Sequence, residues 1–250
     1  MQTYNLSDRV YVITGAAGGV GSTLARHLRS CGARLALGSR NPESLNALAA
    51  ETDSIVERFD GADFASAETL VNAALEKYGQ IDGAICCSGS ILLKPAHLVT
   101  EAEYNATMAA NASAAFALVR AAAKPMMAKG GSIVLFASAA SVAGLSNHEA
   151  IAAAKGAVMG LTLSAAATYA RYGIRVNCVA PGLVETPLTA RITGNEASLK
   201  ASQAMHALGR IGKPEDIAAA ATWLLSDDSS WMSGNTLSVD GGLGHLRSKA

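Results

Sequence analysis

A glycine-rich segment near the start of the chain has the residue types of a phosphate-binding turn. Residues 14–21 read TGAAGGVG and lie between an apolar β-branched run and an amphipathic stretch. Glycine permits a sharp turn and lets a pyrophosphate approach main-chain N–H groups, and the amino terminus of the next helix supplies partial positive charge. An ordinary strand–helix turn could look the same. Between a first strand and a first helix, however, the segment predicts a dinucleotide site.

The end of the second apolar run indicates which dinucleotide would bind. An acidic residue at this point would accept the hydroxyls of the adenosine ribose and repel a 2′-phosphate. The sequence has Ser39 and Arg40 instead, a hydroxyl and a guanidinium suited to a phosphate. We therefore expect NADP(H) to be favoured over NAD(H), although an arginine here could also serve only to cap the turn.

The elements that must position these residues alternate along the whole chain. Short apolar runs predict strands at residues 10–14, 34–38, 54–59, 81–87, 131–138, 174–180 and 236–239. Helical patterns between them lie at residues 19–31, 42–51, 67–78, 101–127, 148–171 and 214–225. Buried strands separated by amphipathic helices indicate a parallel sheet covered on both faces. The expected fold is a doubly wound, three-layered α/β (Rossmann) domain that spans residues 1–250.

Composition narrows the class of protein further. The chain has 250 residues, no net formal charge and 50% hydrophobic residues, which suits a single folded core. Because there is no basic excess, neither nucleic acid nor an anionic membrane is an expected partner. We see no secretory signal and no uninterrupted apolar run long enough to span a membrane. The four cysteines show no CxxC pair and no Cys/His metal spacing, so we expect no metal site and a cytoplasmic location.

Residues 183–209 follow a predicted strand and lack clear periodicity. A long irregular segment at the carboxyl end of a strand is more often a substrate lid than a linker, so we expect a lid here. Its residues are mostly small and apolar, which suggests an uncharged or apolar small-molecule substrate. His206 lies in this segment, where it could contact the substrate or serve only in packing.

Several further motifs, in the same order along the chain, resemble those of the short-chain dehydrogenase/reductase family. The likeness covers essentially the whole chain. It rests on the glycine spacing of residues 14–21, Asp60 and Asp63 in FDGAD, YGQID at 78–82, Asn111, Ser138 after an I-V-x-x-x-S pattern, Lys155, NCVAPG at 177–182 with Thr186, and VDGG at 239–242.

The resemblance implies roles for these positions. Ser138 would orient the substrate oxygen, Lys155 would hold the nicotinamide ribose, and Asn111 would hold a water or a backbone kink. Asp60 would contact the adenine. The implied cofactor-binding set is Gly15, Ala17, Gly19, Val20, Gly21, Ser39, Arg40, Asp60, Gly61, Ser88, Gly89, Lys155, Pro181, Gly182 and Thr186.

The sequence departs from the family pattern at two places. The family's N-N-A-G segment reads CCSG at residues 86–89, which keeps only the glycine. Its catalytic Y-x-x-x-K reads Ile151-Ala152-Ala153-Ala154-Lys155, so the tyrosine position holds isoleucine. Hydride transfer to a carbonyl builds an alkoxide that must be protonated or stabilised, and isoleucine has no ionisable hydrogen.

His148 is a candidate substitute for the missing acid. It lies seven residues before Lys155, the spacing at which divergent enoyl reductases of this superfamily place their tyrosine, and histidine titrates near neutral pH. Glu149 is a weaker candidate. Both residues could instead be ordinary first-turn residues of an exposed helix, where the helix dipole stabilises the negative charge of a glutamate.

Three functions remain open from the sequence. The first is an NADP(H)-dependent oxidoreductase with an altered acid/base, acting on a carbonyl, alcohol or enone. The second is a catalytically silent NADP(H)-binding sensor or partner subunit, and the third is a non-redox enzyme on the same fold. The family resemblance implies a homotetramer or homodimer, with the helices at 101–127 and 148–171 forming an interface.

Overall fold

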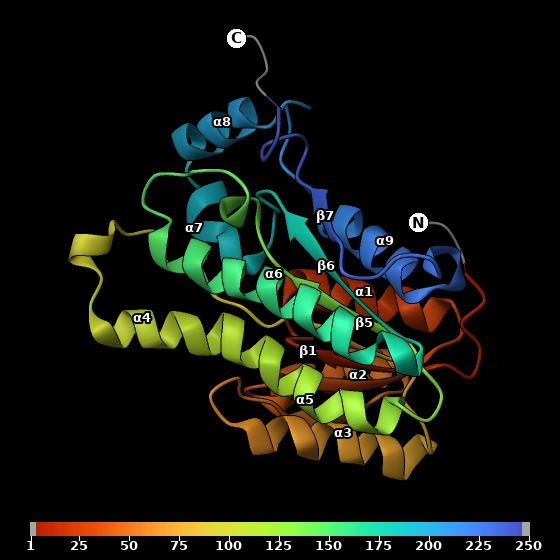
Figure 1. Ribbon diagram of the computed structural model, residues 1–250. Helices are drawn as coiled ribbons and strands as arrows, with labels where there is room; N and C mark the ends of the chain where they lie inside the picture. Colours follow the sequence, from red (N-terminus) through yellow and green to blue (C-terminus); the bar gives the residue numbers. More distant parts are fainter. Residues whose placement is uncertain (1–3, 247–250) are drawn as a thin grey trace.

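The apolar runs form a sheet of seven parallel strands within residues 4–246, which are the residues that the structure describes. The structure is a computed structural model, and its strand order is β3-β2-β1-β4-β5-β6-β7 (Figure 1). The strands are β1 (Val10–Thr14), β2 (Arg34–Ser39), β3 (Ile55–Arg58), β4 (Gly83–Cys86), β5 (Gly131–Phe136), β6 (Ile174–Pro181) and β7 (Thr236–Val239). The order reverses between β1 and β4, which confirms the doubly wound α/β fold expected from the sequence.

Helices cover both faces of this sheet and form one domain with it (Figure 1). One face carries α1 (Gly19–Ser30), α2 (Asn46–Thr52) and α9 (Pro214–Leu225). The other carries α3 (Phe64–Tyr78), α4 (Glu101–Met108), α5 (Ala114–Met126) and α6 (Glu149–Tyr169). Leu24 and Leu224 are fully buried in the first core, and Leu70 and Leu118 in the second. Each such side chain stabilises the fold by about 1.5–3 kcal/mol.

The stretch expected as one helix at residues 101–127 is interrupted. A π-helical turn at Ala109–Ser113 separates α4 from α5. Within it, the side-chain Nδ2 of Asn111 donates to the carbonyl oxygen of Thr107 at 2.9 Å. A side chain that donates to the carbonyl oxygen four residues earlier takes the place of the backbone hydrogen bond that a regular helix would make there. Side chains that enter the backbone hydrogen-bond ladder in this way commonly accompany local widening of a helix.

Two other helices differ from their expected bounds because of local capping. The stretch at 42–51 begins as a 3₁₀ turn over Pro42–Leu45 and becomes α2 only afterwards. Helix α3 begins at Phe64 rather than residue 67, since the Asp63 side chain accepts from the backbone N–H of Ala65 at 3.1 Å. This cap satisfies one of the free donors of the first turn.

The segment after β6 is more ordered than the sequence indicated. It holds a 3₁₀ turn at Pro187–Thr189, α7 (Ala190–Thr193) and α8 (Glu196–Met205). The expectation of an irregular segment over residues 183–209 was therefore wrong. No residue of α8 is buried, so this helix contributes no side chain to either core. The arrows of β6 and β7 point toward α7 and α8, which lie over the carboxyl ends of the strands (Figure 1).

Helix α6 is both long and apolar. Together with the turn that follows it, α6 forms a stretch at Glu149–Tyr172 that is long and apolar enough to cross a membrane, by length and composition alone. The sequence analysis did not predict such a stretch. The helix nevertheless packs against β6, α4 and α5, and Ala154, Val158 and Ala165 are buried in the core. Its apolar character is that of a core helix packed between neighbours.

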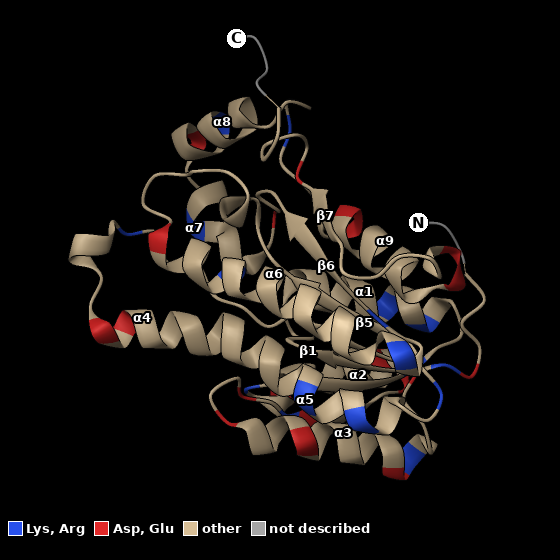
Figure 2. Ribbon diagram, in the orientation of Figure 1, with Lys and Arg blue, Asp and Glu red and all other residues tan. Residues whose placement is uncertain are grey.

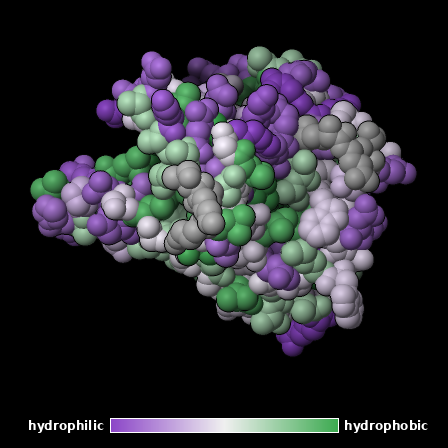
Figure 3. All heavy atoms as spheres, turned by 90° about the horizontal axis from the view of Figure 1, so that it is seen from above, coloured by the Kyte–Doolittle hydropathy of each residue, from purple (hydrophilic) through white to green (hydrophobic). Residues whose placement is uncertain are grey.

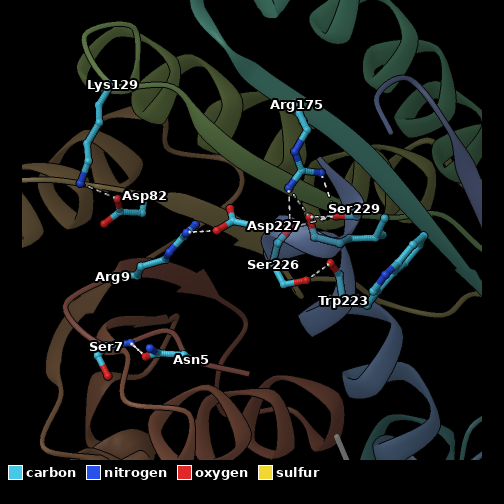
Figure 4. Close-up of polar contacts among 11 residues, drawn as sticks. Asn5, Ser7, Arg9, Asp82, Lys129, Arg175, Trp223, Ser226, Asp227 and Ser229 are labelled. Atoms are coloured by element: carbon cyan, nitrogen blue, oxygen red, sulfur yellow. Dashed lines mark hydrogen bonds and ion pairs between the residues drawn. The ribbon is translucent and has the colours of Figure 1, made fainter. Parts of the chain in front are cut away.

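At the opposite end of the sheet, where the strands begin, charged groups connect neighbouring elements of the fold. A cavity of about 550 Å³ lies there, and two ion pairs lie among its lining residues (Figure 4). Arg9 contacts Asp227 at 2.5 Å, and Lys129 contacts Asp82 at 2.9 Å. Arg175 donates to carbonyl oxygens at the end of α9, where a cation also offsets the helix dipole. These contacts give this end of the sheet a structural role.

Candidate active site

The glycine-rich turn forms a tight cradle between β1 and α1. Gly15 has φ +69°, and a Cβ there would lie 2.5 Å from the backbone N of Ser88. A Cβ on Gly21 would lie 2.5 Å from the carbonyl oxygen of Gly15. Neither position has space for a side chain, and Gly15 also has a backbone conformation that favours glycine. Helix α1 has no side-chain cap and no acidic residue in its first turn, so its free N–H groups and positive dipole end suit an anion.

A cavity of about 420 Å³ begins at this cradle and runs across the carboxyl ends of β1, β2 and β4. The lining includes eight residues assigned to cofactor binding from the sequence: Gly15, Ala17, Ser39, Arg40, Asp60, Gly61, Ser88 and Gly89. Its elongated lining, from the glycine turn to a serine and an arginine at the end of β2, fits a dinucleotide. These residues would hold the diphosphate and the adenosine end of such a cofactor.

A second cavity, of about 160 Å³, continues from the first. The two share Cys87, Ser88, Gly89 and Leu188. This second cavity is lined by five more of the residues that were expected to bind the cofactor: Val20, Lys155, Pro181, Gly182 and Thr186. Gly19 and Gly21 belong to the first turn of α1 and line neither cavity, although a Cβ on Gly19 would lie 2.9 Å from Cγ2 of Thr186.

Ser138, Asn111 and Lys155 come together around this second cavity. They lie on three elements far apart in the sequence: the turn after β5, the π-helical turn and α6. The Ser138 Oγ accepts from the backbone N–H of Ala140 at 3.1 Å. That bond uses an acceptor site of the hydroxyl and leaves its O–H able to donate to a substrate oxygen.

Lys155 is a buried cation at the border of the cavity. Its Nζ donates to the carbonyl oxygen of Phe136 at 2.9 Å, and the residue is 8% exposed. Burial lowers the pKa of Lys155 because the charged form loses its hydration, an effect partly opposed by nearby cysteine thiols. An ammonium carries three donors, so Lys155 can hold hydroxyl groups of a bound ligand while it keeps its contact with Phe136.

Asn111 positions the chain segment between the two cavities. Its Nδ2 donates to Oγ of Ser90 at 3.1 Å, and its Oδ1 accepts from the backbone N–H of Ser90 at 3.3 Å. A Cβ on Gly89 would lie 3.0 Å from Oδ1 of Asn111 and 3.5 Å from Nζ of Lys155. Glycine at position 89 therefore lets both polar groups approach the same backbone. Sequence reasoning missed Ser90, whose only signal was its place directly after Gly89.

Ile151 lines the same cavity and is 4% exposed. It lies four residues before Lys155 on α6, so both residues project from one side of the helix. None of the chain's six tyrosines, all within the described residues, belongs to the lining of this cavity. The lining of the cavity, as far as the described residues go, also has no carboxylate. Its larger side chains are apolar, and they include Ile91, Phe136, Val184 and Leu188.

His148 and Glu149 lie at the start of α6, outside the lining of this cavity. The Nδ1 of His148 lies 2.7 Å from the carbonyl oxygen of Ser146, to which it can only donate. Its Nε2 is then the nitrogen left to exchange a proton. Glu149 is exposed and lines a separate hollow beside α4, together with Tyr104.

The CCSG segment supplies packing rather than reactive thiols. Cys86 is buried in the core and Cys87 lies between the two cavities. Burial raises the pKa of both thiols, with Lys155 only partly opposing it. A thiol held in its neutral form is a weak nucleophile, so these cysteines do not form a catalytic pair.

The fold and the two joined cavities define a dinucleotide-binding α/β protein, and comparison with known proteins identifies its family. The family model described as enoyl-(acyl carrier protein) reductase matches residues 15–244. This chain belongs to the short-chain dehydrogenase/reductase family, whose members are oxidoreductases that use NAD(P)(H).

Several relatives align along nearly their whole length. The chain is 35% identical to 2,5-dichloro-2,5-cyclohexadiene-1,4-diol dehydrogenase of Sphingobium indicum, over 95% of this chain and 98% of that protein. It is also 35% identical to cis-4-hydroxycyclohexanecarboxylate dehydrogenase of Sinomonas cyclohexanicum, over 94% of this chain and 96% of that protein. The crystal structure of levodione reductase superposes with a TM-score of 0.90 at 32% identity, and covers 96% of this chain and 99% of that one.

Proposed function

We propose that the protein is an NADP(H)-dependent oxidoreductase that acts on an uncharged carbonyl, alcohol or enone. The observation that carries this proposal is the continuity of the two cavities. A dinucleotide cradle opens directly into an apolar cavity bordered by Ser138, Asn111 and Lys155. When bound, NADP(H) would supply the hydride at its nicotinamide ring.

The chain's own residues would orient the reactants in this arrangement. Ser138 donates a hydrogen bond to the substrate oxygen, and Lys155 binds the ribose hydroxyls at the cofactor's nicotinamide end. Asn111 keeps the segment at Ser88–Ser90 in place through its bonds to Ser90. The apolar lid residues Val184 and Leu188 exclude water from the reacting atoms, which strengthens these polar contacts.

Preference for NADP(H) follows from the end of β2. Arg40 is exposed at the mouth of the first cavity and makes no ion pair with any residue between 4 and 246. Ser39 lies beside it, with its Oγ 3.2 Å from Oγ of Ser44. Arg40 is thus available to pair with a 2′-phosphate, and neither position carries a carboxylate that would repel one.

The substrate proposed here is a small carbocyclic alcohol or ketone. Two relatives are named for alcohols on six-membered carbon rings, a cyclohexadiene diol and a hydroxycyclohexanecarboxylate. The cavity has apolar walls and one converging set of polar groups, which suits a ring with a single reacting oxygen. Because the lining has no carboxylate among the described residues, we do not expect it to favour a cationic substrate.

His148 remains the proposed source of the proton. Its Nε2 is free to exchange a proton, but the residue lies outside the cavity lining, so a proton must reach the substrate through water. Ile151 favours a second candidate function, a silent NADP(H)-binding sensor or partner subunit, because it puts an apolar side chain next to Ser138 and Lys155. We also propose a cytoplasmic homotetramer or homodimer.

A binding and turnover experiment separates the two candidates. NADPH affinity is measured by fluorescence, and NADPH oxidation is then followed with cyclohexanone, cyclohexenone, quinones and open-chain ketones. The oxidoreductase proposal expects micromolar binding and turnover of a cyclic ketone that falls at least about 10-fold in Ser138→Ala. Tight binding with no turnover across this panel would favour the silent protein, and absence of binding would refute both.

A further inference from the structure

His206 is buried just after α8, with both ring nitrogens hydrogen bonded. The residue is 3% exposed. Its Nδ1 lies 2.7 Å from the carbonyl oxygen of Ser202, one turn back in α8. The backbone N of Leu183, in the segment directly after β6, lies 3.1 Å from Nε2. The imidazole therefore joins the last turn of α8 to the segment that leaves the sheet.

These two contacts determine the protonation state of the ring. A carbonyl oxygen only accepts, so Nδ1 must carry a hydrogen, and the N–H of Leu183 only donates, so Nε2 must lack one. Only the neutral ring with its hydrogen on Nδ1 satisfies both. Once Nε2 is protonated, two donors face each other and a charge is buried, which costs the contact with Leu183.

The ring has little room to turn away from this clash. A Cβ on Gly182 would lie 2.6 Å from Nε2, so the imidazole is pressed against a backbone that only glycine allows there. The ring is confined less closely toward Gly241, where an added Cβ would make ordinary contacts of 3.5 Å with Cβ and Cδ2 of His206. Whether the ring turns or the chain at Leu183 moves, the bond between Nε2 and Leu183 is lost.

The charged groups around the ring are engaged with other partners. Arg210, Asp216 and Asp240 line one cavity of about 330 Å³ together with His206. Arg210 binds Asp216 at 2.7 Å, and the carboxylate of Asp240 accepts from the backbone N–H groups of Gly242 and Gly244, both at 2.9 Å. Within the described residues, neither carboxylate has a hydrogen bond to the imidazole, so none offsets its charge directly.

The segment held by His206 forms one wall of the candidate active site. Gly182, Val184, Thr186 and Leu188 line the cavity that contains Ser138 and Lys155. Leu183 also accepts from the backbone N–H of Gly212 at 2.8 Å, and the N–H groups of Gly182 and Glu185 donate to Val239 at 3.2 Å and to Gly212 at 2.9 Å. The histidine bond is therefore one of several that hold this segment. Loss of one bond would loosen the wall without unfolding the sheet.

We propose that His206 is a positioning residue whose neutral form holds residues 182–189 against the cavity, and whose protonation releases them. The role of these residues in ligand binding rests on the function proposed above, whereas the release itself does not. The held state is complete while the ring is neutral and is lost as the pH falls and the ring gains a proton.

Hydrogen exchange followed by mass spectrometry tests the release on the full chain without any ligand. Protection factors of peptides from residues 182–189 are measured from about pH 8 to about pH 5, the range in which imidazoles commonly titrate. We expect protection to fall about 10-fold or more toward acidic pH, while peptides from β1 and β5 stay protected. Unchanged protection of residues 182–189 would overturn the proposal.

Two variants identify the group responsible. In His206→Gln, the amide can accept from Leu183 but does not titrate, so its protection should not change with pH. His97→Gln, at an exposed histidine in the loop before α4, should behave as the wild type does. A fall in protection that persists in His206→Gln would assign the effect to another group and refute the proposal.

A measurement on the wild type covers the case in which His206→Gln does not fold. Nitrogen NMR of the imidazole should report hydrogen on Nδ1 near neutral pH, and its protonation should run parallel to the loss of protection. Protection that falls while His206 stays neutral contradicts the proposal, as does protonation without loss of protection. If protection behaves as expected but NADPH fails to bind at any pH, the proposed function fails and the role of His206 stands.

Discussion

Replacing Ile151 by tyrosine tests whether the cavity lacks only an acid. Ile151 lies one helical turn before Lys155, where facing Cβ atoms are about 5–6 Å apart. A phenol at position 151 would extend toward the cavity of about 160 Å³ that Ile151 already borders. The ammonium of Lys155 would then lie near the phenol oxygen, favour its ionised form and make it a better proton donor at neutral pH.

The expected gain is large compared with the cost of the substitution. Placing a larger side chain at a buried position costs about 1–3 kcal/mol of stability. Ile151→Phe carries nearly the same steric cost without the hydroxyl, so it is the matched control. A positioned general acid typically contributes about 10²- to 10⁴-fold, so if the cavity lacks only a proton donor, Ile151→Tyr should exceed Ile151→Phe in kcat by that factor. At 1.36 kcal/mol per decade, this corresponds to about 2.7–5.4 kcal/mol of barrier. If His148 already supplies the proton, the two variants should have similar kcat.

The assay follows NADPH oxidation with a cyclic ketone, with thermal unfolding and NADPH affinity measured on the same samples. Equal kcat for Ile151→Tyr and Ile151→Phe, with both variants folded and binding NADPH, would refute the view that the site lacks only a proton donor. A wild type that already turns over as fast as Ile151→Tyr would instead mean that another group, such as His148, supplies the proton.

The remaining predictions concern the cofactor, the proton and the assembly. Arg40→Ala should weaken NADPH binding about 10-fold or more and leave NADH binding unchanged, since a charge-assisted hydrogen bond contributes about 1.5–3 kcal/mol; equal effects in a fluorescence titration would contradict this. His148→Ala should lower kcat by about 100-fold or more without changing NADPH affinity, and an undiminished kcat would exclude His148 as the acid. Leu163 is exposed at 61% on α6, whose visible face carries few charges (Figure 2), and Phe116 is exposed at 48% on α5; charged substitutions there should dissociate the oligomer. Sedimentation of a wild-type monomer at micromolar concentration would refute that interface.

The surface seen from the carboxyl ends of the strands shows how polar and apolar residues are distributed around the lid. Hydrophobic residues gather near the centre of this view, and hydrophilic residues surround them (Figure 3). The described residues around the lid include exposed apolar side chains, among them Leu188 and Leu208 at 54% and 72%. An apolar approach to the cavity is consistent with the uncharged substrate that we propose.

The sequence by itself determined the strands, most of the helices and the position of the nucleotide cradle. Five- to eight-residue apolar runs such as β1 and β6 have few alternatives once amphipathic helices separate them. Gly15 was assigned from the glycine spacing of residues 14–21, and its positive φ and close backbone contact explain why no side chain fits there. Ser138 and Lys155 were found through the family resemblance. They meet because α6 packs beside the sheet and brings Nζ of Lys155 within 2.9 Å of the carbonyl oxygen of Phe136, the last residue of β5.

Only the tertiary structure decided how the segment after β6 folds and what holds it. The sequence analysis assigned no helix to residues 196–205, and α8, which buries no residue, is not held in place by a core-facing side. The bond between Leu183 and His206 joins residues 23 positions apart, and neither residue type indicates the other. The π-helical turn at Asn111 likewise depends on a side chain reaching Thr107 and Ser90 together. Such contacts depend on where the chain returns in space, which local patterns of hydrophobicity do not record.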